Sequence, residues 1–477
     1  MITFICALVI LFLGYFLYGK LAERVFKPDD RLTPAMERPD GVDCVPMKTW
    51  RVFMIQLLNI AGTGPIFGAL LGAVFGPVVF LWIVFGSILG GAVHDYMSGM
   101  ISVRMNGASL SEIIGKYLGG AAKQFMRVFS VFLMILVGAV FTKSPAELLA
   151  RITPSWANTA FWIAVILAYY ILATLLPIDK LIGKFYPLFG GMLILMAVGI
   201  VIGLFVGGYQ IPEMQLANLN PKGTPVFPFM FVTVACGAIS GFHATQSPMM
   251  ARCIQSERQG RRVFYGAMIV ESIIALVWAA AGVAFYETTG GLQNALANLG
   301  QSGVVYGISI VLLGTVGGEL AIIGVVVCPI STGDTAFRSA RLTVADWFKI
   351  DQSRFIKQFA VTIPLVAAST ALTLLNVEVI WRYLSWCNQT FAVFTLWAEA
   401  MYLVRNAKKR WYSLMCALPV AFMTSVCTSY ILMADEGFKI SSAIAYPIGI
   451  SLAAVCTVLF TVKSIKAVRK VQQNNDT

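Results

Sequence analysis

Long apolar runs recur along this 477-residue chain and constrain its fold more than any other feature. About thirteen runs reach the ~20 residues that an α-helix needs to cross a bilayer. Apolar residues make up 58% of the chain, only 12% of residues are charged, and the mean hydropathy is +0.78. We therefore expect an all-α polytopic membrane protein of about thirteen transmembrane helices.

Lysine and arginine are unevenly distributed between the segments that join these runs. Roughly 30 of the 35 cations follow odd-numbered runs or lie in the carboxyl-terminal tail. The other segments hold Lys143, Arg151, Lys222, Arg382 and Lys439. This positive-inside pattern predicts an outside amino terminus and a cytoplasmic carboxyl terminus. The net charge of +12 then faces anionic lipid and does not indicate nucleic-acid binding.

Motifs for covalent chemistry and metal binding do not occur in the sequence. The nine cysteines are scattered, without a CxxC or a Cys/His cluster, so neither a disulfide framework nor a metal site is indicated. There is also no nucleophile elbow, HExxH or P-loop. We therefore expect no enzyme and no cofactor, apart from a coupling Na⁺ or H⁺.

Two polar interruptions break the second and the seventh apolar run. Residues 61–65 (AGTGP) interrupt the second run, and residues 240–248 (SGFHATQSP) interrupt the seventh, which extends from Phe227 to Met250. Irregular backbone at membrane depth is tolerated only where it is buried in protein or lines a watery cavity. These breaks therefore predict a binding site. The candidate substrate-binding residues are Gly62, Thr63, Gly64, Gly241, Phe242, His243 and Thr245.

The spacing of the breaks predicts an inverted repeat. The two broken runs are five runs apart, and an odd separation gives the second unit the opposite orientation in the membrane. Residues 1–51 would form an N-terminal helix and a cytoplasmic loop, residues 52–207 and 208–404 two five-helix repeats, and residues 405–477 two further helices and a tail. Alternatively, Gly64, Gly68, Gly72 and Gly76 serve close helix packing, and Pro65 only kinks a helix.

Ionisable residues within apolar runs are candidates for ion coupling, because a charge in hydrocarbon is costly. His94 and Asp95 lie in GGAVHDYMSGM and Glu271 lies in GAMIVESIIAL. Asp95 would couple protons or bond to a neighbouring helix, and Glu271 would titrate or pair with an arginine from another span. His243 would exchange a proton with an anionic ligand or satisfy freed backbone groups.

The ninth run, Val304 to Val327, continues into VVVCPISTGDTAFRSAR. Ser331, Thr332 and Asp334 supply oxygen atoms that could coordinate Na⁺ or relay protons. The alternative is that residues 331–334 terminate one helix and cap the next. The candidate ion-coupling residues are therefore His94, Asp95, Glu271, Ser331, Thr332 and Asp334.

Four motifs resemble those of a known family. GAVHDYMSGMISVRMNGASLSE, AISGFHATQSP, YGAMIVESIIAL and GDTAFRSARL are similar to motifs of the carbon-starvation protein A family of bacterial inner-membrane transporters. The resemblance covers most of the chain from the second run to about the eleventh. It implies uptake of peptides or small carboxylates such as pyruvate, on a fold related to the leucine-transporter type. By position, it places both breaks around the substrate and the hydroxyls of Ser331 and Thr332 beside a coupling cation.

The function expected from these features is secondary active transport under carbon starvation, by proton or Na⁺ symport with alternating access. Free backbone N–H groups and positive helix ends at the breaks would favour a carboxylate. The partners would be a small-molecule substrate and the lipid bilayer, and the sequence leaves the oligomeric state open. The alternatives are a membrane channel and a starvation sensor. A channel would need a continuous polar stripe along several helices, whereas this sequence shows isolated polar breaks. A sensor would need a cytoplasmic output domain, whereas the loops are short.

Overall fold

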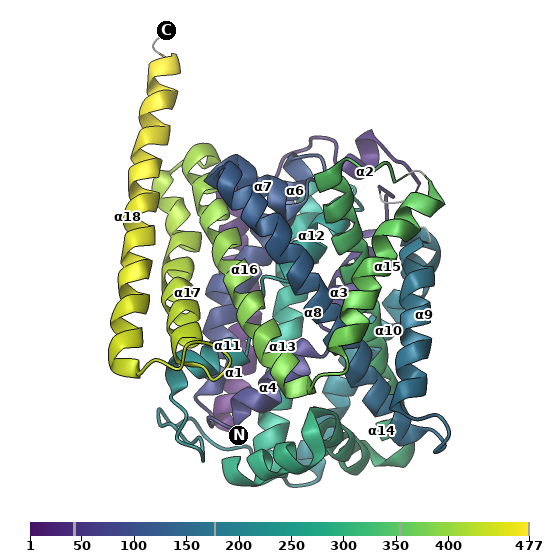
Figure 1. Cartoon of the computed structure of the whole chain (residues 1–477). Coiled ribbons are helices and arrows are strands. Elements are labelled where there is room, and N and C mark those ends of the chain that lie inside the picture. The colour runs from purple at the N-terminus through teal and green to yellow at the C-terminus, as the bar shows by residue number, and fades with distance from the viewer. Residues whose placement is uncertain (42–43, 176–177, 353, 476–477) are drawn as a thin grey trace.

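The computed structural model describes the backbone of residues 1–41, 44–175, 178–352 and 354–475. Within these ranges the chain consists of helices that pack side by side, without a β-strand (Figure 1). Helices satisfy every backbone hydrogen bond inside a single segment, which is why apolar runs of this length adopt them in a membrane. The expected all-α class is confirmed, and the chain is a multi-pass membrane protein.

The helices follow the apolar runs closely in the amino-terminal half. The elements of this half are α1 (Ile2–Phe26), α2 (Pro34–Glu37), α3 (Thr49–Ile60), α4 (Gly64–Ala73), α5 (Val79–Leu81), the π-helical η1 (Trp82–Gly91), α6 (Ala92–Arg104), α7 (Leu110–Leu118), α8 (Gly120–Ile152), α9 (Thr159–Leu175) and α10 (Ile178–Val206). The elements of the carboxyl-terminal half are η2 (Val226–Met230), α11 (Phe231–Thr233), α12 (His243–Ala251), η3 (Glu257–Gln259), η4 (Arg261–Tyr265), α13 (Gly266–Phe285), α14 (Thr289–Phe348), α15 (Phe355–Leu372), α16 (Val377–Asn406), η5 (Arg410–Ser413), α17 (Leu414–Met433) and α18 (Ser442–Asn475).

In its described part, the structure contains fewer candidate membrane-spanning helices than the thirteen expected. Nine helices in the described ranges are long and apolar enough to cross a membrane, and the bent pair of α3 and α4 makes up to ten. The expected count of thirteen therefore stays a prediction, as do the boundaries of the two five-helix units.

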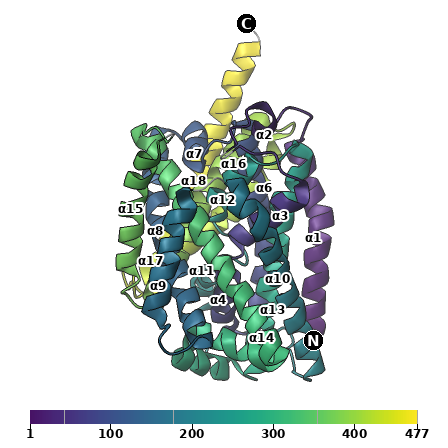
Figure 2. The ribbon, with the colours of Figure 1, turned by 90° about the vertical axis from the view of Figure 1, so that its right-hand side faces the viewer.

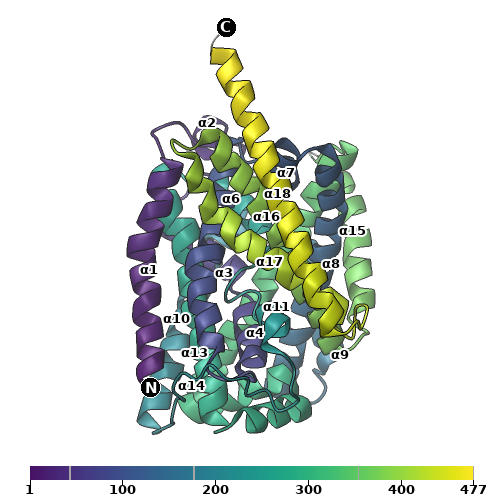
Figure 3. The same cartoon turned by 90° about the vertical axis from the view of Figure 1, so that its left-hand side faces the viewer.

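The two chain ends lie at opposite ends of the molecule. Figures 1 and 3 place the amino terminus at the bottom, while α2 and α7 lie at the top, where the end of α18 projects beyond the other helices. The basic segments near α2 and α7 are thus on the side of the carboxyl terminus. This arrangement agrees with the positive-inside pattern, although the side that faces the cytoplasm stays a prediction.

The ninth predicted span, Val304 to Val327, is interrupted in the structure. Gly314, within this range, has a φ angle of 71°, a left-handed conformation that favours glycine and bends α14. The first part of α14 lies across the bottom of the molecule in Figure 1, and the rest of the helix rises through it in Figure 2. The predicted boundary was wrong because an apolar sequence does not distinguish a crossing helix from one that folds back at a glycine.

Candidate functional site

The first break separates α3 from α4 and bends the pair by 48°. Pro65 lies in the first turn of α4, which begins at Gly64, and there its missing N–H costs no hydrogen bond. In the described part of the chain, no protein acceptor is paired with the N–H groups of Gly62 and Thr63. The buried Thr63 hydroxyl and both polar atoms of the buried Asn59 amide also have no protein partner there. Orphaned polar groups of this kind indicate a ligand site, because each would cost ~1–3 kcal/mol if left unsatisfied.

The second break lies earlier in the chain than predicted. Residues 234–242 are non-helical, between the end of α11 at Thr233 and the start of α12 at His243. Residues 243–248 of the SGFHATQSP motif are therefore helical, which corrects the expected position. The polar residues mark the start of the new helix, whereas the irregular backbone includes the apolar stretch VACGAI.

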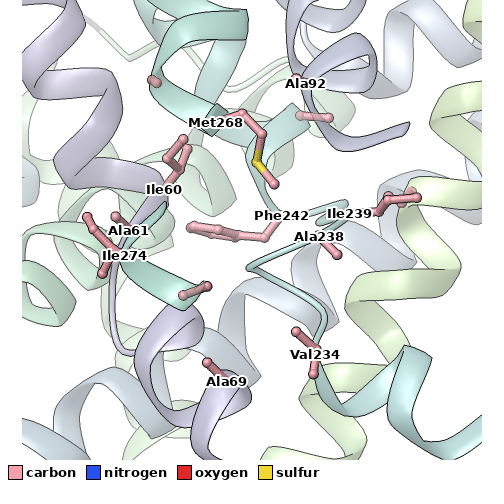
Figure 4. Close-up of a cluster of buried hydrophobic side chains, with 14 of the residues drawn as sticks. Ile60, Ala61, Ala69, Ala92, Val234, Ala238, Ile239, Phe242, Met268 and Ile274 are labelled. Atoms are coloured by element: carbon pink, nitrogen blue, oxygen red, sulfur yellow. The ribbon is translucent and has the colours of Figure 1, made fainter. Parts of the chain in front are cut away.

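The two breaks lie against each other. A Cβ atom built on Gly64 would lie 2.3 Å from Cys236 Sγ, so the start of α4 approaches the second break at a distance that only glycine permits. Figure 4 shows the Phe242 ring extending from the second break toward the side of Ile60 and Ala61. The juxtaposition expected from the repeat is therefore present in the structure.

A small cavity of about 20 Å³ lies between the breaks. Ile60, Gly64, Cys236 and Phe242 line it, together with residues of α8 and α16. It adjoins a larger cavity of about 240 Å³, with which it shares Thr233, Trp381 and Ser385. The larger cavity is bounded by the 220–224 loop and by the first part of α14, which lie on the side of the amino terminus.

A third cavity, of about 40 Å³, lies on the other side of the break. Among its lining residues are Thr245, Met249 and Asp346. Thr245, a predicted substrate-binding residue, therefore lines this inner cavity and not the one between the breaks. Its hydroxyl group donates to the Phe242 carbonyl at 2.7 Å.

Asn388 of α16 satisfies the backbone of the second break. Its side-chain oxygen accepts a hydrogen bond from the Phe242 N–H at 2.6 Å, and its carbonyl oxygen accepts one from the Gly241 N–H at 3.2 Å. These two N–H groups are therefore not free to hold a substrate. Phe242 still lines the cavity between the breaks, so the substrate-binding role of Gly241 and Phe242 stays a prediction. Unpaired backbone donors occur at both breaks, because the N–H groups of Ala235, Cys236, Gly237 and Ser240 also have no protein acceptor in the described part of the chain.

Four predicted ionisable residues converge at the start of α12. Asp95 of α6 contacts two histidines: His243 Nδ1 lies 2.9 Å from one of its carboxylate oxygens and His94 Nδ1 lies 2.9 Å from the other. On its opposite edge, His243 Nε2 is 3.4 Å from a carboxylate oxygen of Glu271, in α13. All four side chains are fully buried. Glu271 is thus beside a histidine and not beside the arginine that the sequence left open.

The three predicted residues of the ninth run lie in an unbroken part of α14, so the alternative of a helix end at residues 331–334 is wrong. The Thr332 hydroxyl lies 3.2 Å from the Leu58 carbonyl of α3 and 2.9 Å from the Cys328 carbonyl. The Ser331 hydroxyl donates to the Cys328 carbonyl at 2.7 Å. Ser331 and Thr332 are therefore beside the first break, and Asp334 is buried one turn further along α14.

Comparison with known families decides where this chain belongs. The family described as carbon starvation protein CstA matches residues 1–168 and 153–288. This chain belongs to the CstA family. The resemblance carried by the four sequence motifs is thereby confirmed.

Among the relatives of this CstA-family chain is an uncharacterized membrane protein of Haemophilus influenzae, 44% identical over 62% of this chain and 94% of that protein. A protein of Campylobacter jejuni named peptide transporter CstA is 31% identical, over 57% of this chain and 48% of its own length. A protein of Escherichia coli named pyruvate/proton symporter BtsT is 29% identical, over 55% and 46%. The matched part thus spans about half the length of the latter two relatives.

Two solved structures share the fold of the CstA-family chain. The Eremococcus coleocola manganese transporter has a TM-score of 0.55 and 12% identity, covering 91% of this chain and 99% of that one. The nucleobase-cation-symport-1 family transporter Mhp1 has a TM-score of 0.56 and 14% identity, covering 90% and 96%. The leucine-transporter type of fold is confirmed. The Campylobacter and Escherichia relatives and both structural neighbours are named as transporters, so the expectation of a non-enzyme is also confirmed.

Three residues of this CstA-family site were missed in the sequence. Asn59 and Asn388 are polar residues in apolar helices. Their residue type and their position in an apolar run are the only features of the sequence that could have indicated a role in the site. Glu399 of α16 is fully buried, has no hydrogen-bond partner among the described residues, and belongs to a helix that packs against α6, which contains Asp95. An acidic residue in an apolar run is a signal that could have identified Glu399.

Proposed function

We propose that this CstA-family protein is a secondary active transporter of the bacterial inner membrane that imports a small carboxylate such as pyruvate, or a peptide, by proton symport during carbon starvation. The observation that carries the proposal is the contact of His243 with Asp95 and Glu271 at the start of α12. His243 directly follows the second break, so a change in the protonation of the cluster would act on the backbone that borders the small cavity between the breaks.

The net charge of the cluster explains how it would bind a proton. With both carboxyl groups ionised, His243 protonated and His94 neutral, the four buried side chains carry a net charge of −1. An uncompensated buried charge is costly, so the closed protein favours uptake of one further proton. Opening of the site to water stabilises the charged form and releases that proton. Glu399, which is buried in α16 where this helix packs against the α6 helix of Asp95, would extend the same relay.

A carboxylate substrate fits the polar groups of the first break. The N–H groups of Gly62 and Thr63, the Thr63 hydroxyl and the Asn59 amide can donate to an anion. The amino terminus of α4 adds the positive end of a helix dipole. In addition, Lys222 and Arg382, two of the few cations expected on the outer side, line the larger cavity.

The unequal cavities support alternating access. The larger cavity, of about 240 Å³, adjoins the breaks from the side of the amino terminus, and the cavity on the other side has only about 40 Å³. Substrate and proton would enter from the larger cavity, and their joint binding would favour the conformation that opens the other side. Each ligand can shift this equilibrium only by its difference in affinity for the two states.

Na⁺ is the second candidate for the coupling ion. The hydroxyl groups of Ser331 and Thr332 and the carbonyl oxygens of Leu58 and Cys328 lie together beside the first break. Oxygen atoms of this kind, at an unwound helix, are ligands that Na⁺ accepts in transporters. Asp334 would act only indirectly in either scheme, one turn from these hydroxyls.

Uptake into proteoliposomes tests the proposal. Radiolabelled pyruvate and a dipeptide would be offered under an inward proton gradient, an inward Na⁺ gradient, or neither. We expect accumulation of at least one of the two substrates under the proton gradient alone. Uptake that ignores both gradients would contradict symport, and accumulation driven by Na⁺ alone would transfer the coupling role to Ser331 and Thr332.

A further inference from the structure

A second cavity system lies on the outer surface of the bundle, away from the transport site. A groove of about 700 Å³ lies between α1 and α3 and is bounded by α13, against which both helices pack. Figure 2 shows α1 at the edge of the molecule, next to α3. The groove is lined mainly by apolar side chains: Phe12, Tyr15, Phe16, Phe53, Ile269, Val270 and Ile273.

One end of this groove is basic. Lys48 and Arg262 line it there and are both exposed, and Trp50 is beside them with 54% of its surface exposed. Among the residues that the structure describes, none of those lining the groove is acidic. The neighbouring Arg261 is already paired, because its Nε lies 2.8 Å from a carboxylate oxygen of Glu23. Lys48 and Arg262 thus form a positive mouth on an apolar groove.

We infer that the groove binds an anionic phospholipid, with its acyl chains along the apolar walls and its phosphodiester on Lys48 and Arg262. The chemistry is complementary at both ends, since acyl chains match the aromatic and branched lining and a phosphodiester matches the two cations. Lys48 directly precedes α3 and Arg262 lies in η4, so the mouth is on the side where the other basic segments gather. The bound lipid would join α1 to the helix pair α3 and α13, next to the first break.

The inference is tested by measuring lipid retention in native mass spectrometry of the full-length protein in detergent. Phosphatidylglycerol and phosphatidylcholine of equal chain length would be titrated separately. We expect phosphatidylglycerol to bind more tightly, and the double variant Lys48→Ala/Arg262→Ala to weaken it roughly 30-fold while leaving phosphatidylcholine unchanged. The matched control is Lys408→Ala/Lys409→Ala, which removes two exposed cations from the loop before α17 and should change neither affinity.

A second variant tests the same lipid site if Lys48→Ala/Arg262→Ala is unstable. Ile273→Trp adds bulk to the groove without changing the mouth, and it should reduce the binding of both lipids. Equal binding of the two lipids by the wild-type protein would overturn the inference, as would full phosphatidylglycerol binding in Lys48→Ala/Arg262→Ala. Dimers that form through the groove and exclude lipid would overturn it as well.

Discussion

Lys222 contributes positive charge to the larger cavity, and its side chain has no hydrogen-bond or ion-pair partner among the described residues. It lines the cavity that adjoins the two breaks, together with Arg382, which is 3.3 Å from Glu436. Lys222→Gln should therefore raise the KM for pyruvate about threefold and leave kcat unchanged, because a surface charge attracts an anion to the site without touching the proton cluster. A zwitterionic dipeptide should be affected less.

Uptake kinetics at low and high ionic strength measure this effect. The difference between wild type and Lys222→Gln should shrink as salt screens the charge. Lys439→Gln, which changes an exposed cation outside the cavity lining, is the control. An equal change of KM in both variants would exclude a specific role for Lys222.

At the scale of helices, the close approach of the two breaks depends on Gly64. Gly64→Ala places a Cβ 2.3 Å from Cys236 Sγ and 2.6 Å from its Cβ, so the two breaks must separate. We expect uptake to fall at least about tenfold, since misplacement of about 1 Å in a site can cost that much or more. Gly64→Ala/Cys236→Gly removes the opposing side chain and should recover much of the lost rate.

Initial uptake rates, normalised to monodisperse protein, measure this rescue. Cys236→Gly alone controls for the loss of the thiol. Full activity of Gly64→Ala would show that the two breaks need not touch for transport.

The connection of α7 to α8 provides a pH-dependent test of stability. Glu112 of α7 accepts hydrogen bonds from Lys123 at 2.6 Å and from Arg127 at 2.8 Å, both in α8. Partial burial acts to raise the pKa of Glu112, but the bonds and charges of Lys123 and Arg127 outweigh it and hold that pKa below its ordinary value. The carboxylate therefore stabilises the fold above the ordinary glutamate pKa of about 4.3, and this contribution is lost as pH falls through the lowered pKa.

Glu112→Gln should lower the free energy of unfolding by less than about 1 kcal/mol at pH 7, because the ion pairs are partly exposed. The difference from wild type should disappear in acid below the lowered pKa. Thermal unfolding in detergent over this pH range measures both quantities. A constant difference at every pH would contradict the ionic origin of the effect.

The sequence predicted the broken helices better than it predicted their limits. The Gly-Thr-Gly-Pro cluster disfavours a continuous helix, so the first break was found where it begins, at Ala61, although Gly64 and Pro65 already belong to α4. The second break begins in an apolar stretch, and its backbone is satisfied by Asn388, 146 residues after Phe242 in the chain. A contact of such long range has no local signal. The break was therefore assigned to the polar residues that follow it.

At the scale of the whole molecule, the repeat arithmetic predicted that two distant breaks meet. It could not predict that Asp95, His243 and Glu271 contact one another, because the three residues belong to three separate helices and their rotation about the helix axes is set by packing. Gly314 shows that local hydropathy can also predict a continuous helix where the chain bends. Its apolar neighbours predict a crossing helix, while its left-handed backbone, visible only in the fold, bends the chain.

The orientation of the molecule is a prediction of the charge pattern. A protease-cleavable tag at the amino terminus should be removed by protease added to intact spheroplasts, because that end is expected outside. A tag after α18 should be protected until the membrane is permeabilised. Protection of the amino-terminal tag together with cleavage of the carboxyl-terminal tag would invert the topology and the direction assigned to the two cavities.

The most direct test of the account concerns Asp95, which joins both histidines of the buried cluster. Asp95→Asn retains the size of the side chain but removes its negative charge. In proteoliposomes we predict that this variant loses proton-driven accumulation of the transported substrate and retains counterflow exchange. Glu271→Gln should show the same loss and the same retention. Unchanged accumulation by Asp95→Asn under an imposed proton gradient would contradict the assignment of this cluster as the coupling site.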